Sequence, residues 1–171
     1  MTEPQPSMDE PRLPGARAGT FVARWVTPCE PGQIQPNGVD LRGERLFRVT
    51  GPGRLDPTGT VPGPREEVPW SQAEPLAPGA YVVRYRERIT IPPGHVGQVF
   101  PRSSLLRNGA VLFSALWDQG YEGQGEGLLV LWQAMHIPPG ARLGQLVLWP
   151  AEAAPGYQGQ YQGEGDPGRR A

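Results

Sequence analysis

Two short segments carry the side chains whose types and spacing indicate chemistry. In the segment Pro101-Arg102-Ser103-Ser104-Leu105-Leu106-Arg107, two arginines flank a pair of serines. Guanidinium groups offer forked donors to phosphate oxygens, and serine hydroxyls add further donors. Asp118 follows eleven residues after Arg107 and opens the segment Asp118-Gln119-Gly120-Tyr121-Glu122-Gly123. Its carboxylate is able to orient or deprotonate water. The two segments together predict a nucleotide site.

The elements that must position these side chains are expected to be strands. Short apolar runs of strand length lie at residues 95–100, 110–117, 128–132 and 143–149, and residues 81–89 are rich in strand-forming types. The 24 Gly and 22 Pro place turn signals between the runs. Only residues 104–108 suggest a helix, of a single turn. This pattern predicts an all-β barrel or sandwich.

The length of 171 residues favours one folded domain with tails. Residues 1–18 are polar and Pro-rich without periodic apolar positions, which predicts a disordered N-terminal tail. The folded domain is expected over residues 19–152, with a Gly/Pro-rich loop at about 51–79 that is too long for a simple hairpin. Residues 153–171 are Gly-rich and polar and are expected to form a C-terminal arm and tail.

Charge and cysteine content exclude several classes of partner and site. The 16 basic and 17 acidic residues give a net charge of −1, which argues against a general nucleic-acid or membrane-surface binder. Cys29 is the only cysteine, so no intrachain disulfide framework or thiolate metal cluster is expected. No apolar run approaches the roughly 20 residues of a membrane span, and the first eighteen residues lack a signal-like apolar stretch. A cytoplasmic location is the expectation.

Five segments in order resemble the motifs of one superfamily, the trimeric deoxyuridine triphosphatases and deoxycytidine triphosphate deaminases. Residues 34–42, which include Asp40, look like the first motif, and residues 101–107 look like the second, phosphate-binding motif. Residues 110–123 resemble the third, residues 143–146 the fourth, and residues 157–163 the C-terminal arm of the deaminase-like and archaeal-type members. The resemblance covers most of residues 34–165.

The resemblance implies a distorted β-barrel protomer in a homotrimer whose active sites are shared between subunits. It implies Mg²⁺ arriving with a deoxyribonucleoside triphosphate, with Asp40 near the metal through water, and Asp118 positioning the attacking water. Tyr121 would pack on the deoxyribose and reject a 2′-hydroxyl group. The implied catalytic residues are Asp118 and Asp40, and the implied substrate-binding residues are Arg102, Ser103, Ser104, Arg107, Tyr121, Gln145, Tyr161 and Gln162.

The superfamily contains two activities, and the residue type at one strand position indicates which of them this sequence favours. Deaminases resemble one another in carrying a proton-shuttling glutamate in the strand after the third motif, and the alignment puts Val130 there. Glu126 is the nearest acid, on the same face of an extended strand but about 13 Å away. An apparent two-residue excess around residues 124–127 suggests a β-bulge. Hydrolysis of dUTP to dUMP and pyrophosphate is therefore favoured. The alternatives are deamination of dCTP and a non-catalytic, nucleotide-binding regulatory trimer.

Overall fold

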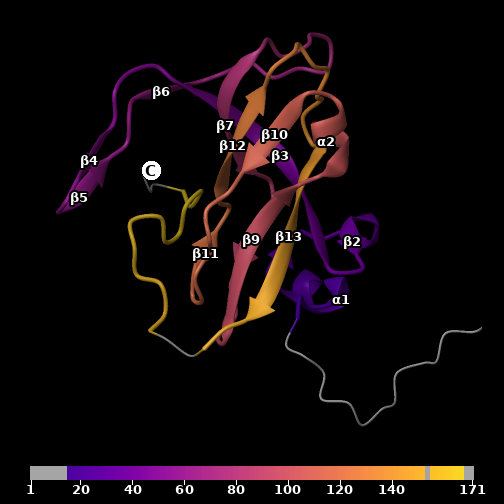
Figure 1. The fold of residues 1–171 in the computed structure, drawn as a ribbon, viewed down its shortest axis with the longest axis vertical. Coiled ribbons are helices and arrows are strands. Elements are labelled where there is room, and N and C mark those ends of the chain that lie inside the picture. The colour runs from indigo at the N-terminus through magenta and orange to yellow at the C-terminus, as the bar shows by residue number, and fades with distance from the viewer. Residues whose placement is uncertain (1–14, 153–154, 168–171) are drawn as a thin grey trace, which may run out of the picture.

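Strands dominate the protein in its computed structural model, which describes residues 15–152 and 155–167 (Figure 1). The helical elements are short: α1 Gly19–Val22, η1 Ala23–Trp25, η2 Pro31–Gln33 and α2 Ser103–Arg107. The strands are β1 Val26–Thr27, β2 Ile34–Gln35, β3 Gly38–Val49, β4 Arg54–Asp56, β5 Gly59–Val61, β6 Arg65–Glu67, β7 Gly79–Tyr85, β8 Arg88–Thr90, β9 His95–Pro101, β10 Ala110–Phe113, β11 Glu122–Gly123, β12 Glu126–Leu131 and β13 Arg142–Pro150. The predicted all-β class is confirmed.

The main sheet has eight antiparallel strands organised around the long strand β3. Its order is β10-β12-β7-β3-β13-β9, and β2 and β6 also pair with β3. The first half of β3, up to Arg42, pairs with β13, and from Gly43 onward β3 pairs with β7, with an irregularity in that register between Gly43 and Arg45. Such an irregularity bends a strand and increases its twist. β3 therefore joins the two halves of the sheet and lets it curve.

The two ends of this sheet meet and nearly close it into a distorted barrel, as predicted. Gly97 in β9 and Trp117, which follows β10, exchange two backbone hydrogen bonds of 2.8 and 2.9 Å. Closure protects both sheet edges and encloses an apolar interior. Fully buried members of that interior are Leu41, Leu46, Tyr81, Tyr85, Ile89, Leu112, Leu129, Leu146 and Leu148.

One expected strand is interrupted. Residues 81–89 form the end of β7 and the start of β8, which belong to different sheets, with a break at Arg86 and Glu87. The Glu87 side chain is fully buried and accepts hydrogen bonds from the Arg42 backbone and guanidinium groups at 2.9 and 2.7 Å, and from the Gln33 amide at 2.9 Å. A buried carboxylate needs such donors, so the chain turns inward there. The local strand propensity gives no sign of this.

The other predicted elements are found with shifted bounds. The helical turn expected at residues 104–108 is α2, and the apolar runs form β9, β10, β12 and β13. The excess at residues 124–127 is a change of sheet rather than a bulge: β11 pairs with β8, β12 pairs with β7, and the β12 register is continuous. Within the Gly/Pro-rich loop, β4 and β5 form a hairpin that projects from the barrel, and β6 returns to β3 (Figure 1).

The chain ends are described only in part. Residues 1–14, 153–154 and 168–171 lie outside the described residues, so the disordered N-terminal tail and the end of the C-terminal tail stay predictions. Arg17 contacts the barrel through its backbone amide, which donates to the Leu148 carbonyl at 2.8 Å, and its guanidinium, which donates to His95 at 2.8 Å. No helix within residues 15–152 and 155–167 has the length and apolarity needed to cross a membrane.

Candidate functional site

A buried carboxylate on β3 gathers cationic side chains from two other elements. Asp40 is only 1% exposed, and its Oδ2 atom lies 3.3 Å from the Arg102 Nε atom and 3.3 Å from the Arg142 Nη1 atom. The Gln35 amide donates to the same oxygen at 3.3 Å. Burial raises the pKa of Asp40, and the two guanidinium groups oppose that rise. We name Asp40, Arg102, Arg142 and Gln145 the phosphate cluster, after the ligand that the sequence predicts for Arg102 and Gln145.

Strand pairing explains how these distant residues meet. In the β3–β13 ladder Gln145 lies directly opposite Asp40, and β9 on the other side of β13 leads into Arg102. Arg142 begins β13 and was not among the predicted site residues. Its position just before the fourth motif was the available signal. The sequence alone does not show that β13 folds back beside β3.

Three further predicted phosphate ligands lie on α2, next to the cluster. Ser103, Ser104 and Arg107 are all exposed, and α2 begins directly after Arg102. Leu105 is the helix residue that is buried, and it anchors the turn to the core. The remaining α2 side chains therefore face solvent, where a ligand can reach them.

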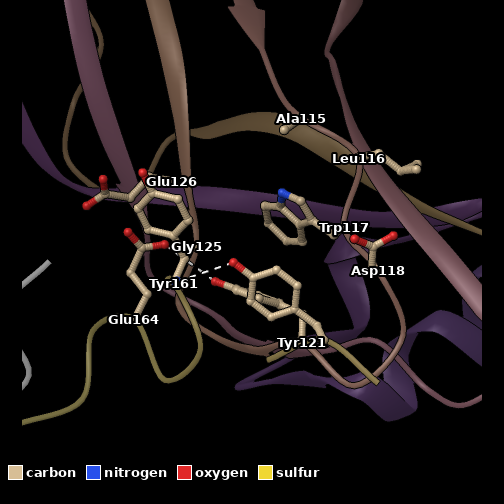
Figure 2. A pocket seen from close by; sticks show the side chains of 10 residues that line it. Ala115, Leu116, Trp117, Asp118, Tyr121, Gly125, Glu126, Tyr161 and Glu164 are labelled. Carbon is tan, nitrogen blue, oxygen red and sulfur yellow. Dashed lines mark hydrogen bonds between the residues drawn. The ribbon is translucent and has the colours of Figure 1, made fainter. Parts of the chain in front are cut away.

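A second group of predicted residues lines an aromatic cavity of about 280 Å³, near the lower end of the sizes typical of small-molecule pockets (Figure 2). The Trp117 and Tyr121 rings form its centre, with 5.3 Å between ring centroids. Asp118 lies on one side of the two rings, and Glu126 and Glu164 lie on the other (Figure 2). The cavity, which we name the aromatic pocket, is lined by Ala115, Leu116, Trp117, Asp118, Tyr121, Gly125, Glu126, Tyr157, Tyr161 and Glu164.

A tight turn aims Asp118 and Tyr121 in different directions. The Tyr121 amide donates to the Asp118 carbonyl at 3.2 Å, and the intervening Gly120 has φ +80°, which glycine adopts without strain. Tyr121 is consequently buried, whereas Asp118 is exposed. Within the described part of the chain, the Asp118 carboxylate has no side-chain hydrogen bond or ion pair. Both of its oxygens are therefore unoccupied by other side chains of the described residues.

The acid on β12 is engaged by arginines from two neighbouring strands. One Glu126 oxygen lies 2.8 Å from the Arg84 Nη2 atom, and the other accepts from the Arg65 Nη1 atom at 2.5 Å. Arg84 faces Glu126 across the β7–β12 ladder. Val130, on the same face of β12, faces Val111 and Ala80 instead and does not line the aromatic pocket. The one β12 carboxylate that lines the pocket is therefore paired with arginines through both of its oxygens.

The C-terminal segment, residues 155–167, supplies the other wall of the aromatic pocket. Tyr161 lines it, and the Gln162 side chain bonds to the turn beside it, donating to the Gly120 carbonyl at 2.9 Å. Glu164 also reaches into the pocket and is 8% exposed. Glu164 was not predicted as a site residue, although it stands only two residues beyond Gln162.

The phosphate cluster and the aromatic pocket are separate in one chain. Trp117 pairs with Gly97 in β9, and Arg102 follows Gly97 by five residues. Five residues of extended chain span about 16 Å. None of the phosphate-cluster residues lines the aromatic pocket. The sequence motifs thus assemble into two half-sites rather than one continuous site.

Comparisons with known proteins show which family the chain belongs to. Residues 16–151 match the family model described as dCTP deaminase-like. A probable deoxyuridine 5′-triphosphate nucleotidohydrolase of Halobacterium salinarum is 46% identical over 153 residues, which cover 85% of this chain and 93% of the relative. A probable deoxyuridine 5′-triphosphate nucleotidohydrolase of Aeropyrum pernix is 41% identical over 140 residues, covering 78% of this chain and 87% of the relative.

A solved structure supports the fold independently. The crystal structure of 2′-deoxycytidine 5′-triphosphate deaminase from Agrobacterium tumefaciens matches with a TM-score of 0.59 at 21% identity, covering 82% of this chain. The match covers 49% of that chain, so this protein spans about half of the deaminase's length. With the family model matching most of the chain, this protein belongs to the dCTP deaminase-like family.

Proposed function

We propose that the protein hydrolyses dUTP to dUMP and pyrophosphate. The observation that carries the proposal is the Asp118 carboxylate, which lies exposed at the rim of the aromatic pocket and has no side-chain partner among the described residues. Hydrolysis requires such a group to orient or deprotonate the attacking water. The relatives in Halobacterium salinarum and Aeropyrum pernix, both probable deoxyuridine 5′-triphosphate nucleotidohydrolases, support the same substrate.

The side chains on β12 favour hydrolysis over deamination. A proton shuttle must be free to accept and release a proton at the base, and a valine at position 130 has no such group. Both oxygens of Glu126 are held by guanidinium donors from Arg84 and Arg65, so this acid is committed to an ion-pair network. Deamination of dCTP is therefore the less favoured activity.

The phosphate cluster fits a triphosphate that carries Mg²⁺. Mg²⁺ is usually held by one or two carboxylates together with substrate phosphates, and Asp40 is a single carboxylate beside two arginines. The ion, when bound, neutralises charge on the phosphates. Arg102 would turn from Asp40 to a phosphate oxygen, Asp40 would face the hydrated ion, and Ser103, Ser104, Arg107 and Gln145 would complete the contacts.

A homotrimer would unite the two half-sites. In one chain the phosphate cluster and the aromatic pocket are separate, about 16 Å apart along extended chain, and a second copy would place one directly opposite the other. Large apolar side chains are exposed around β9, β10 and β12, where subunits would associate; they include Phe100, Phe113, Leu128 and Trp132. Exposed apolar patches of this kind mark interaction sites.

Mixing two inactive variants tests the shared site. Asp118→Asn removes the proton-accepting carboxylate of one half-site, and Arg102→Ala removes a phosphate ligand of the other. After unfolding and refolding together in equal amounts, random trimers would regain about one quarter of the wild-type activity, because that share of sites combines two intact halves. A mixture as inactive as its components would rule out sharing, and refolded wild type serves as the control.

The substrate is tested directly by incubation with Mg²⁺ and either dUTP or dCTP, resolving nucleotides, pyrophosphate and ammonia in the same samples. We expect dUMP and pyrophosphate from dUTP, and no ammonia from dCTP. Release of ammonia from dCTP would show deamination and would make Glu126 the candidate proton shuttle. Inactivity on both nucleotides would favour a regulatory nucleotide-binding trimer. A cytoplasmic location and the lack of nucleic-acid or membrane partners stay predictions from composition.

A further inference from the structure

The C-terminal segment docks on its own chain, directly over the aromatic pocket. The Tyr157 amide donates to the Gln119 carbonyl at 2.7 Å, and the Gly163 amide donates to the Glu122 carbonyl at 2.7 Å. The Gln124 amide in turn donates to the carbonyl of the segment's own Glu164 at 2.8 Å. In Figure 1 the segment runs alongside β11. These backbone bonds fix its register against residues 119–124.

Glu164 is the acidic residue of this segment that lines the pocket, together with Tyr157 and Tyr161. It lies between Gly163 and Gly165, whose φ angles of +73° and +86° form a turn that other residues rarely adopt. That turn directs the Glu164 side chain inward, where it is 8% exposed. The Tyr121 hydroxyl donates to its Oε2 atom at 3.5 Å. Glu164 and Tyr157 thus cover the ring predicted to select the sugar.

The charged and titratable groups around Glu164 come from four segments. Glu126 on β12 faces it as a second carboxylate, while Arg84 on β7 and Arg65 on β6 are already paired with Glu126. Tyr121 approaches from the turn before β11. Burial, followed by repulsion from Glu126, raises the pKa of Glu164 to about 7, and the two arginines and the Tyr121 hydrogen bond offset this only in part.

We propose that Glu164 is a positioning residue that holds the Tyr121 phenol from the C-terminal segment and thereby couples docking of that segment to sugar selectivity. The coupling rests on the proposed function, because it takes Tyr121 as the ring that contacts the deoxyribose. The docking itself is visible in the structure and does not depend on that function. Glu164 acts through Tyr121 and needs no contact with substrate.

Docking should then respond to pH in a defined direction. The docked state binds the Glu164 proton more tightly than the undocked state, because its pKa is raised from the ordinary glutamate value to about 7. Docking is therefore strongest below the ordinary glutamate pKa and weakens as the pH rises toward 7. Between pH 5.5 and 8 the docking equilibrium is expected to fall by about 30-fold.

Amide hydrogen exchange without nucleotide tests the docking. The Gln124 and Gly163 amides report it, since each bonds across the docked interface. After correction for intrinsic exchange, their protection should fall by about 30-fold between pH 5.5 and 8 in the wild type. Glu164→Gln should show no such fall. It also makes the segment's second tetrad, Tyr161-Gln162-Gly163-Glu164, identical to its first, Tyr157-Gln158-Gly159-Gln160. An equal fall in Glu164→Gln would overturn the proposal.

Binding of dUMP and UMP tests the coupling without any turnover. Glu164→Ala at pH 5.5 should lower the ratio of the UMP to the dUMP dissociation constant by about fivefold, the worth of one hydrogen bond. Glu164→Gln should keep the ratio at pH 5.5 and pH 8, because its amide oxygen still accepts from Tyr121. An unchanged ratio in Glu164→Ala would refute the positioning role.

A matched control excludes a general charge effect. Gln160→Glu places a carboxylate at the exposed, equivalent position of the first tetrad and should follow the wild type in both experiments. If the wild type binds dUMP but does not hydrolyse dUTP, the proposed function fails while the Glu164 assignment is still decided by exchange and binding. If hydrolysis occurs and the exchange profiles match, the Glu164 assignment alone fails.

Discussion

Replacing Asp118 with Asn separates catalysis from folding and binding. The side chain is exposed, and it has no side-chain partner within the described residues, so the substitution removes no packing or ion pair. The free energy of unfolding should therefore change by less than about 0.5 kcal/mol. Asn keeps the size and polarity of Asp but is unable to take a proton from water. Loss of general-base assistance lowers kcat by about 10²–10⁴, which corresponds to roughly 2.7–5.5 kcal/mol of barrier.

The assay combines pyrophosphate release under saturating dUTP with calorimetric binding of a non-hydrolysable dUTP analogue. We expect kcat to collapse, the dissociation constant to stay within about threefold, and thermal unfolding to match the wild type. Near-normal kcat would remove Asp118 from the mechanism. A parallel loss of binding and kcat would instead assign it to substrate contact. Glu66→Gln, at another exposed acid on β6, is the control for loss of one surface charge.

Substitutions at three further positions test other parts of the protein. Tyr121→Ala should abolish the preference for dUTP over UTP, whereas Tyr121→Phe should reduce it only about fivefold; an unchanged rate ratio in the Ala variant would discard sugar packing. Asp40→Asn should raise the Mg²⁺ concentration for half-maximal activity by about 10–100-fold, and an unaltered Mg²⁺ titration would contradict its role beside the ion. Glu87→Ala leaves Arg42 without its buried partner and should cost about 3–5 kcal/mol of stability. Calorimetry should then show a Tm lowered by roughly 6–20 °C, and a shift below about 3 °C would mean that the network is dispensable.

The strand pattern and the residue types of the motifs could be predicted because they depend on local chemistry. Alternating apolar positions and Gly/Pro turns are sufficient to indicate β9, β10, β12 and β13, and the short helix after Arg102 follows from its sequence. The break after β7 could not be predicted. It depends on Glu87 bonding with Arg42, 45 residues away, and a local pattern contains no information about that partner.

Linear order also left the surroundings of the site undecided. The sequence by itself determined which side chains are available: the carboxylates of Asp118 and Asp40, the Arg-Ser-Ser segment at residues 102–104, and Val130 at the position predicted for a proton shuttle. Only the tertiary structure decided which other side chains contact them. Antiparallel pairing of β3 with β13 brings Arg142 to Asp40, and pairing of β12 with β7 commits Glu126 to Arg84.

The separation into two half-sites and the placement of Glu164 likewise follow from tertiary contacts. The distance between Trp117 and Arg102 is set by where the segment after β10 meets β9, and Glu164 enters the pocket because the C-terminal segment docks on residues 119–124. These contacts join residues far apart in the chain, and they stabilise the protein only once the barrel has closed. Side-chain chemistry is thus encoded position by position, whereas burial, pairing and pKa belong to the folded whole.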